Sequence, residues 1–223
     1  MRQVFLVLGY GIPKNILQDE NYGLYLKSVF NQIFAWCAEH DAWNPVIIFS
    51  GGKTDMIRPY RRTEAEEMIR LFRVLMRRPS VKKHLAHWFL IPEMKALSTL
   101  DNFLYAKKIL HKYHFGIKRV IVFGEQTRRH RITALAKRIF KRSQMMSIDF
   151  DQSENRYLDE KFLQQKESHG LKMDRWALKS QKNLKKHREL FKQKLKVFRQ
   201  AGSKHHVQAI RLWWEKELQQ FPL

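Results

Sequence analysis

The chain has 223 residues, of which 44% are hydrophobic, and it carries a formal net charge of +22 with a pI near 10.2. Its hydrophobic content excludes a disordered protein, and its length suits one α/β domain with an appendage. The single cysteine excludes an internal disulfide framework, and because no run of roughly 18 apolar residues is present for a transmembrane segment, we expect a cytoplasmic protein.

Five short apolar runs alternate with segments of helical periodicity along the first two-thirds of the chain. The runs, in order, are residues 4–8, 46–49, 88–91, 120–123 and 145–148. Runs of this length are typical of strands buried on both faces of a parallel sheet. The helical segments between them span about 22–40, 63–76, 98–116 and 131–141. The alternation predicts an α/β fold for residues 1–150, a Rossmann-like three-layer sandwich with a mainly parallel five-stranded sheet.

Residues 151–223 differ in character and predict a helical, basic C-terminal extension. Residues 171–200 carry 11 basic and 2 acidic side chains, a net charge of +9. We expect Gly170 to break the chain after a short helix, and an apolar stripe on Asp174–Arg199 indicates a basic helix that ends at Gly202. The extension is expected to pack on the domain or on a partner, and its charge would attract nucleic acid, anionic lipid or an acidic protein.

Small residues follow the first two predicted strands. Gly9-Tyr10-Gly11 allows a close approach of a ligand to the backbone, but it lacks the third glycine of a dinucleotide fingerprint, so an NAD site is not expected. An ordinary tight turn is the alternative. Ser50-Gly51-Gly52-Lys53-Thr54 follows the second strand, where successive amide N–H groups can converge on an anion and Lys53 adds a charged donor. These loops predict a ligand site at the carboxyl edge of the sheet.

Carboxylates are expected at the same edge. Glu64 lies inside a Thr63–Glu66 capping box, where it either favours the helix dipole or is a spare carboxylate for a ribose hydroxyl, a metal or a proton. Glu93 follows the third strand and precedes Thr99 and Asn102 at the start of the next helix. N-capping explains one polar residue at that helix start, but it does not explain Glu93 or Asn102.

The order of these pieces resembles the YdcF/SanA/ElyC-like proteins, catalogued as domain of unknown function 218, over residues 4–148. The shared succession is strand–GxG, strand–SGG, TEAE, E….STLDN and a later apolar strand before a basic segment. The resemblance implies a Rossmann-like domain that binds a small polar or nucleotide-like ligand, and S-adenosylmethionine is one candidate. It implies a site lined by Gly9, Gly11, Ser50, Gly51, Gly52, Glu64, Glu93, Thr99 and Asn102.

A basic segment, Arg128-Arg129-His130-Arg131, follows the fourth predicted strand and Glu125. Arginines at a strand-to-helix junction can bind a phosphate group bidentately. The family to which the chain is similar shows T-S-x-x-H-x-x-R here, and Thr127 stands at the position of its histidine, so His130 is the candidate that would replace it as an acid or base. A solvated or capping histidine is the alternative.

Two hypotheses of function stay open. In the first, the domain binds a small anionic or nucleotide-type ligand, with a hydrolase or transferase reaction on a phosphorylated substrate as one outcome. In the second, the basic C-terminal helices bind nucleic acid, and an anionic membrane surface is a further alternative for them. The candidate catalytic residues are Glu64, Glu93 and His130. The candidate ligand-binding residues are Gly9, Tyr10, Gly11, Ser50, Gly51, Gly52, Lys53, Thr99, Asn102, Glu125, Arg128 and Arg131.

No particular cofactor is predicted. Asp149 and Asp151 follow the fifth predicted strand and could join Glu64 and Glu93 to bind a divalent metal through their oxygens. Such ligands would converge from different loops, so their spacing in the sequence does not test the idea.

Overall fold

A computed structural model describes the chain except for residues 1, 115–116, 150–159, 203–205 and 221–223. The chain divides into two compact units. The first, here called the α/β unit, comprises Met1–Asp55 and Tyr60–Asp151, and the second, the helical unit, comprises Met56–Pro59 and Gln152–Leu223. None of the helices in the described part of the chain is long and apolar enough to cross a membrane.

The α/β unit is built on a five-stranded sheet with the strand order β3-β2-β1-β4-β5. Every neighbouring pair of strands is parallel. The strands are β1 (Arg2–Leu8), β2 (Val46–Ser50), β3 (Phe89–Glu93), β4 (Ile117–Glu125) and β5 (Ser143–Ile148). The apolar runs of the central strands are buried on both sides. The α/β fold with a five-stranded parallel sheet that the sequence predicts is therefore confirmed.

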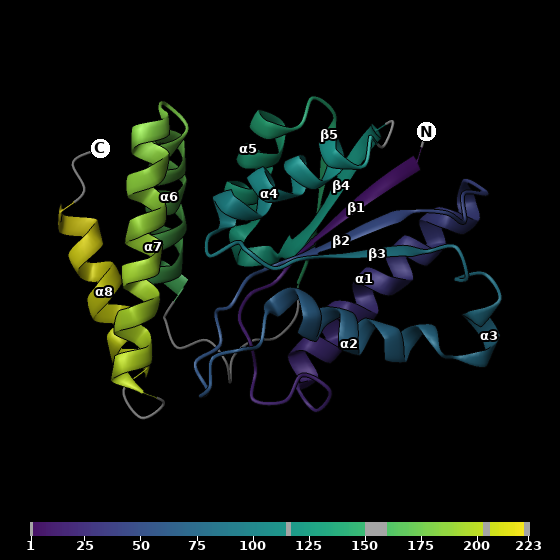
Figure 1. The fold of residues 1–223 in the computed structure, drawn as a ribbon, viewed down its shortest axis with the longest axis horizontal. Helices are drawn as coiled ribbons and strands as arrows, with labels where there is room; N and C mark the ends of the chain where they lie inside the picture. The colour runs from purple at the N-terminus through teal and green to yellow at the C-terminus, as the bar shows by residue number, and fades with distance from the viewer. Residues whose placement is uncertain (1, 115–116, 150–159, 203–205, 221–223) are drawn as a thin grey trace. The chain divides into compact units, whose positions relative to one another are not determined.

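Helices cover both faces of this sheet (Figure 1). On one face lie α1 (Glu20–Glu39) and α2 (Glu64–Met76), and on the other lie α4 (Thr99–Lys112) and α5 (Arg129–Ile139). A short helix, α3 (Pro79–Lys82), precedes β3, and a 3-10 turn, η1 (Gln126–Arg128), follows β4. The chain crosses from one face to the other between β3 and β4, so the strand order reverses between β1 and β4. Ligands of open α/β folds bind outside the carboxyl ends of the strands at such a switch point.

The core between the sheet and the α1–α2 layer is rich in aromatic rings. Phe49 of β2 meets Phe72 of α2 at 5.0 Å between ring centroids, and Phe72 meets Phe30 of α1 at 5.4 Å. Phe5 of β1 stacks near Phe123 of β4 at 6.0 Å. Because these rings come from both helices and three strands, they pack α1 and α2 firmly against the sheet.

The predicted helix caps are present. The Thr63 hydroxyl accepts from the Glu66 backbone N–H at 3.2 Å, which confirms Thr63 as the N-cap, and it donates to the Glu66 carboxylate at 2.7 Å. At the start of α4, the Ser98 hydroxyl accepts from the Asp101 N–H at 3.1 Å, so Ser98 is the N-cap residue and Thr99 is the first residue of the helix.

The helical unit contains α6 (Glu160–Ala177), α7 (Gln181–Ala201) and α8 (His206–Gln220). The expectation that Gly170 breaks the chain is wrong, because Gly170 is buried inside α6. The break comes instead at Ser180, whose hydroxyl accepts from the Asn183 N–H at 3.1 Å and caps α7. The single basic helix expected over Asp174–Arg199 is therefore two helices. A lone glycine costs a helix only about 1 kcal/mol, which packing readily offsets, whereas a serine cap starts a new helix.

Candidate functional site

Strand register brings the predicted site loops to one edge of the sheet. Leu8 of β1 pairs with Ser50 of β2, and Ser50 pairs with Glu93 of β3. On the other side, Val7 pairs with Phe123, so Glu125 at the end of β4 stands level with Gly9. β3 is an edge strand, which is why it can include Pro92 and run on to Glu93 instead of ending at Ile91 as expected.

Ser50, Glu93 and Asn102 form a buried hydrogen-bonded group. The Ser50 hydroxyl donates to Glu93 Oε2 at 2.7 Å and lies 3.0 Å from Asn102 Oδ1. Glu93 Oε1 accepts from the Lys95 N–H at 2.7 Å and the Ala96 N–H at 3.2 Å. With both oxygens bonded and the residue 3% exposed, Glu93 anchors the loop between β3 and α4. This arrangement accounts for the two polar residues that capping did not explain.

Burial raises the pKa of the Glu93 carboxyl above its ordinary value of 4.5, although the bonds from Ser50 and the two amides lower it, and nearby Asp101 raises it further. A carboxyl with a raised pKa in the folded state contributes stability that is full below 4.5 and is lost as the pH rises through the raised pKa. We therefore expect the stability of the wild type, relative to Glu93→Gln, to fall as the pH rises above 4.5. Urea unfolding of both proteins as a function of pH measures this.

The exposed residue Glu39 supplies the control for that experiment. Because Glu39→Gln removes one carboxyl from the surface, its unfolding free energy at neutral pH should stay within about 0.5 kcal/mol of the wild type. A constant difference in unfolding free energy between the wild type and Glu93→Gln would contradict the anchoring role of a buried, titrating carboxyl.

The amides of the glycine loops are already used by the fold. Gly9 N–H donates to the Ser50 carbonyl at 3.1 Å, Gly51 N–H to the Glu93 carbonyl at 3.0 Å, and Gly52 N–H to the Ala96 carbonyl at 2.7 Å. These three groups therefore hold neighbouring strand ends together and are not available to an anion. The prediction that successive glycine amides form an anion-binding loop is corrected on this point.

The glycines instead make room for Glu64. A Cβ on Gly9 would lie 2.1 Å from Glu64 Oε2, and a Cβ on Gly51 would lie 2.5 Å from Glu64 Cβ. The backbone N–H of Glu64 donates to the Gly52 carbonyl at 3.1 Å, and the Thr54 hydroxyl donates to Glu64 Oε1 at 2.5 Å. Glu64 is thus held directly over the ends of β1 and β2, at the first residue of α2.

Arg128 reaches across the switch point from the turn after β4. Its Nη2 donates to the Gly9 carbonyl at 3.0 Å, and its Nε lies 3.9 Å from Glu125 Oε2. The side chain of Arg128 is 14% exposed. Glu125 itself accepts from the Thr127 N–H at 2.8 Å and from the Thr127 hydroxyl. The guanidinium is therefore held between the loops that follow β1 and β4.

Two tyrosines near the start of α1, Tyr22 and Tyr25, contact the backbone of the loop after β1, and sequence reasoning missed both. Tyr10 stacks on Tyr22 with ring centroids 4.1 Å apart, and the Tyr22 hydroxyl donates to the Gly11 carbonyl at 2.5 Å. The Tyr25 hydroxyl donates to the Leu8 carbonyl at 2.9 Å. Two tyrosines three positions apart, just after a GxG loop, are the signal that could have found Tyr22 and Tyr25.

The pKa of Tyr25 shows how close the charges are. Burial raises the pKa of its hydroxyl, Arg128 lowers it, and Glu125 and Glu64 raise it. The geometry agrees with this, because Gly9 lies against Glu64 and accepts from Arg128, which in turn lies 3.9 Å from Glu125. Glu64, Glu125 and Arg128 thus form a group of mixed charge, which we call the switch-point cluster.

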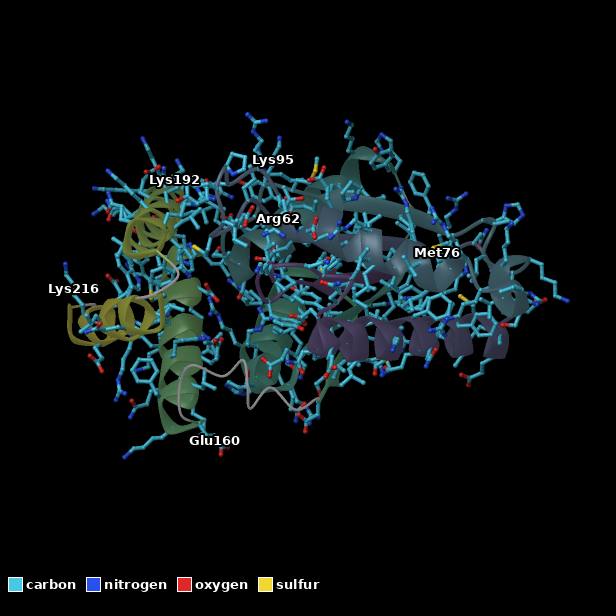
Figure 2. The ribbon with its side chains drawn as sticks, turned by 90° about the horizontal axis from the view of Figure 1, so that it is seen from below. Arg62, Met76, Lys95, Glu160, Lys192 and Lys216 are labelled. Atoms are coloured by element: carbon cyan, nitrogen blue, oxygen red, sulfur yellow. The ribbon has the colours of Figure 1, made fainter. Side chains whose placement is uncertain are left out.

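A second ion pair that sequence reasoning missed lies beside this cluster. Arg62, labelled in Figure 2, donates to Asp55 through Nε at 3.0 Å and Nη2 at 2.8 Å. Its Nη1 donates to the Pro13 carbonyl at 2.9 Å, so the segment before α2 is tied to the loop after β1. Asp55 is 2% exposed. The pair positions the start of α2, and therefore Glu64.

The remaining predicted site residues fall into two groups. Thr99 and Arg131 are buried, whereas Lys53 and His130 are exposed. In the part of the chain that the structure describes, His130 makes no hydrogen bond or ion pair. Gly11 has a φ of +131°, a conformation that suits only glycine.

The carboxylates considered for a divalent metal do not gather. Across the described ranges, no three His, Cys, Asp or Glu side chains lie close enough to hold a metal ion. Asp149 is exposed, and Asp151 lies outside the described residues. Glu93 is committed to the anchor with Ser50, whereas Glu64 lies over Gly9 and Gly51.

Comparisons of the chain with protein-family models, curated proteins and solved structures found no match, so the similarity to YdcF-like proteins remains a prediction from the sequence.

Proposed function

We propose that the α/β unit binds a small anionic or nucleotide-type ligand at the carboxyl edge of its sheet, at the switch-point cluster. The observation that carries this proposal is that the Arg128 side chain is largely buried but makes few hydrogen bonds. Its only hydrogen bond within the described structure goes to the Gly9 carbonyl, although its side chain is only 14% exposed. The 3.9 Å separation from Glu125 is too long for a hydrogen bond.

A largely buried guanidinium with spare N–H groups is suited to an anion. Burying a charge is costly unless it is paired and hydrogen-bonded, and a phosphate or carboxylate would satisfy several N–H groups at once. Arginine provides the planar, bidentate geometry for such an ion. The position also agrees with where doubly wound folds bind nucleotides.

Glu64 would recognise the polar part of the same ligand. Its carboxylate is fixed by Thr54 and lies against the backbone of Gly9 and Gly51, so its position is set before a ligand arrives. A carboxylate near the end of the second strand accepts hydrogen bonds from ribose hydroxyls in doubly wound folds. We place the acid–base role of a hydrolase or transferase reaction at Glu64, because the hydrogen bonds of Glu93 anchor a loop.

The test compares Arg128→Gln with Arg129→Gln, since Arg129 is the exposed neighbour on the same segment. Thermal shift and calorimetry would use ATP, AMP, S-adenosylmethionine, glucose 6-phosphate and inorganic phosphate as probes. At a probe concentration of about 100 Kd, we expect the wild type to gain about 2.7 kcal/mol of stability. Arg128→Gln should abolish this gain, and Arg128→Lys should weaken binding at least about tenfold by losing the fork geometry.

Arg129→Gln carries the same loss of charge and should keep the wild-type affinity. Equal losses in Arg128→Gln and Arg129→Gln would mean that the probes bind through general basicity. Failure of every probe to protect the wild type would remove the proposal for these ligand classes.

A further inference from the structure

The helical unit buries three of its acidic side chains, whereas most of its lysines lie at the surface. Glu167 and Asp174 of α6 and Glu217 of α8 are buried. Asp174 lies 3.2 Å from His187 Nε2 of α7, with both side chains 0% exposed. The surface of these helices is therefore more positive than their sequence alone indicates.

One row of basic residues runs along the exposed face of α6. Its members, at spacings that keep to one side of a helix, are Lys161, Lys172 and Arg175, and Lys179 continues the row just past the end of α6. Exposed, uncharged Gln165 and Ser168 occupy the same side between them. Within the described residues, none of the four basic side chains forms an ion pair or hydrogen bond. The row is thus open to an external anion.

A second row runs along α7. Its members are Lys182, Lys185, Lys186, Lys192 and Lys196, all exposed. Glu189 is the one acidic residue on α7, and its carboxylate accepts from Lys192 Nζ at 2.8 Å (Figure 2, where Lys192 is labelled). At a rise of about 1.5 Å per residue, this row is roughly 21 Å long. The first row ends at Lys179, three positions before Lys182, where the second row begins.

The apolar side of α7 is occupied inside the unit. Phe191 and Phe198 are buried, as is Trp214 of α8, and Lys194 lies over the rings of Phe191 and Trp214 at 4.3 and 5.4 Å. These aromatic rings are therefore not available to stack on bases. They also leave α7 without the apolar face that a helix needs to lie in a membrane surface.

We propose that the two basic rows bind the phosphate backbone of nucleic acid without sequence preference. A nucleic-acid strand carries one charge about every 3.4 Å, so a row of roughly 21 Å matches about six phosphates. Apart from Lys192, which pairs with Glu189, the lysines of the α7 row make no ion pair within the described residues, and they provide the charge complementarity. The two rows belong to the helical unit and the switch-point cluster to the α/β unit, so this proposal does not rest on the small ligand.

The experiment measures the affinity of the full chain for a fluorescein-labelled DNA duplex of 20 base pairs, by anisotropy, between 50 and 200 mM KCl. We expect log K to fall with log salt at a slope of about −3 to −5. The triple variant Lys182→Gln, Lys185→Gln and Lys186→Gln should reduce the magnitude of this slope by about 3 and weaken binding at least about tenfold at 100 mM salt.

A matched control removes the same charge from the α/β unit by replacing the exposed lysines Lys27, Lys107 and Lys137 with glutamine. This variant should bind the duplex within about twofold of the wild type. Glu189→Gln removes the acid from the α7 row and frees Lys192, so it should strengthen binding and steepen the slope by about 1. Circular dichroism confirms that each variant keeps its helices.

Three results would overturn the proposal. The first is an equal loss of affinity in the control and in the α7 triple variant, which would assign binding to net charge. The second is no change, or weaker binding, in Glu189→Gln. The third is a wild type that binds acidic phosphatidylserine vesicles or a polyglutamate peptide but not the duplex.

Discussion

Replacing Gly52 with alanine is expected to lower the unfolding free energy of the α/β unit by about 3 kcal/mol. The added Cβ would lie 2.4 Å from the Ala96 carbonyl oxygen, a backbone atom that cannot swing aside. The same oxygen accepts the Gly52 N–H at 2.7 Å, and the Gly52 carbonyl accepts the Glu64 N–H. Any shift therefore strains both the β3–α4 loop and the start of α2. Thermal unfolding should show a melting temperature lower by roughly 6–12 °C.

Gly23→Ala is the matched control. Gly23 lies within α1, and a Cβ there would meet no heavy atom within 4 Å. Because alanine is the better helix former, this change should raise the unfolding free energy by about 0.5–1 kcal/mol. If Gly52→Ala were as stable as Gly23→Ala, the close packing of the loop after β2 against Ala96 would be wrong.

The fold could be predicted because the strands have a distinctive pattern of continuous apolar residues. Runs such as Val46–Phe49 are apolar throughout, and only a strand covered on both faces needs that pattern. Strand ends were less predictable. Ser50 and Glu93 belong to their strands because they pair with each other across the sheet, and that register is not visible in either segment alone.

The C-terminal helices were predicted by type but not by boundary. Gly170 is a weak helix former, and local reasoning placed a break there, yet tertiary burial holds it inside α6. Ser180 follows Lys179 in a strongly basic stretch that reads as continuous helix, and its role as a cap depends on one hydrogen bond to Asn183. Local propensity therefore misplaced both boundaries.

The sequence predicted the location of the candidate site but not the contacts that its residues make. Glycines at the ends of β1 and β2 suggested free amides, whereas their purpose is to let Glu64 approach the backbone. Which glycine N–H is free depends on the neighbouring strand, so a single loop cannot show it. Tyr22, Tyr25 and Arg62 were missed for the same reason, since their contacts come from other segments.

Replacing Gly9 with alanine is expected to displace the Glu64 carboxylate and thereby abolish ligand binding at the switch-point cluster. The new Cβ would overlap Glu64 Oε2, at 2.1 Å, and the side chain must leave its bond with Thr54. Overpacking of this kind costs about 1–3 kcal/mol. Probe binding measured by calorimetry should be lost in Gly9→Ala and in Glu64→Ala alike.

A double-mutant cycle separates this effect from general damage. In the Gly9→Ala/Glu64→Ala protein, the overlapping carboxylate is gone and the closest remaining atom, Glu64 Cβ, is 3.0 Å away. The loss of unfolding free energy in the double mutant should therefore be smaller than the sum of the losses in the two single mutants, by about 1 kcal/mol or more. Ligand binding should not return, because the carboxylate is missing. Additive losses of stability would show that the two residues do not touch, and unchanged binding in Glu64→Ala would leave Arg128 as the only recognition group of the two.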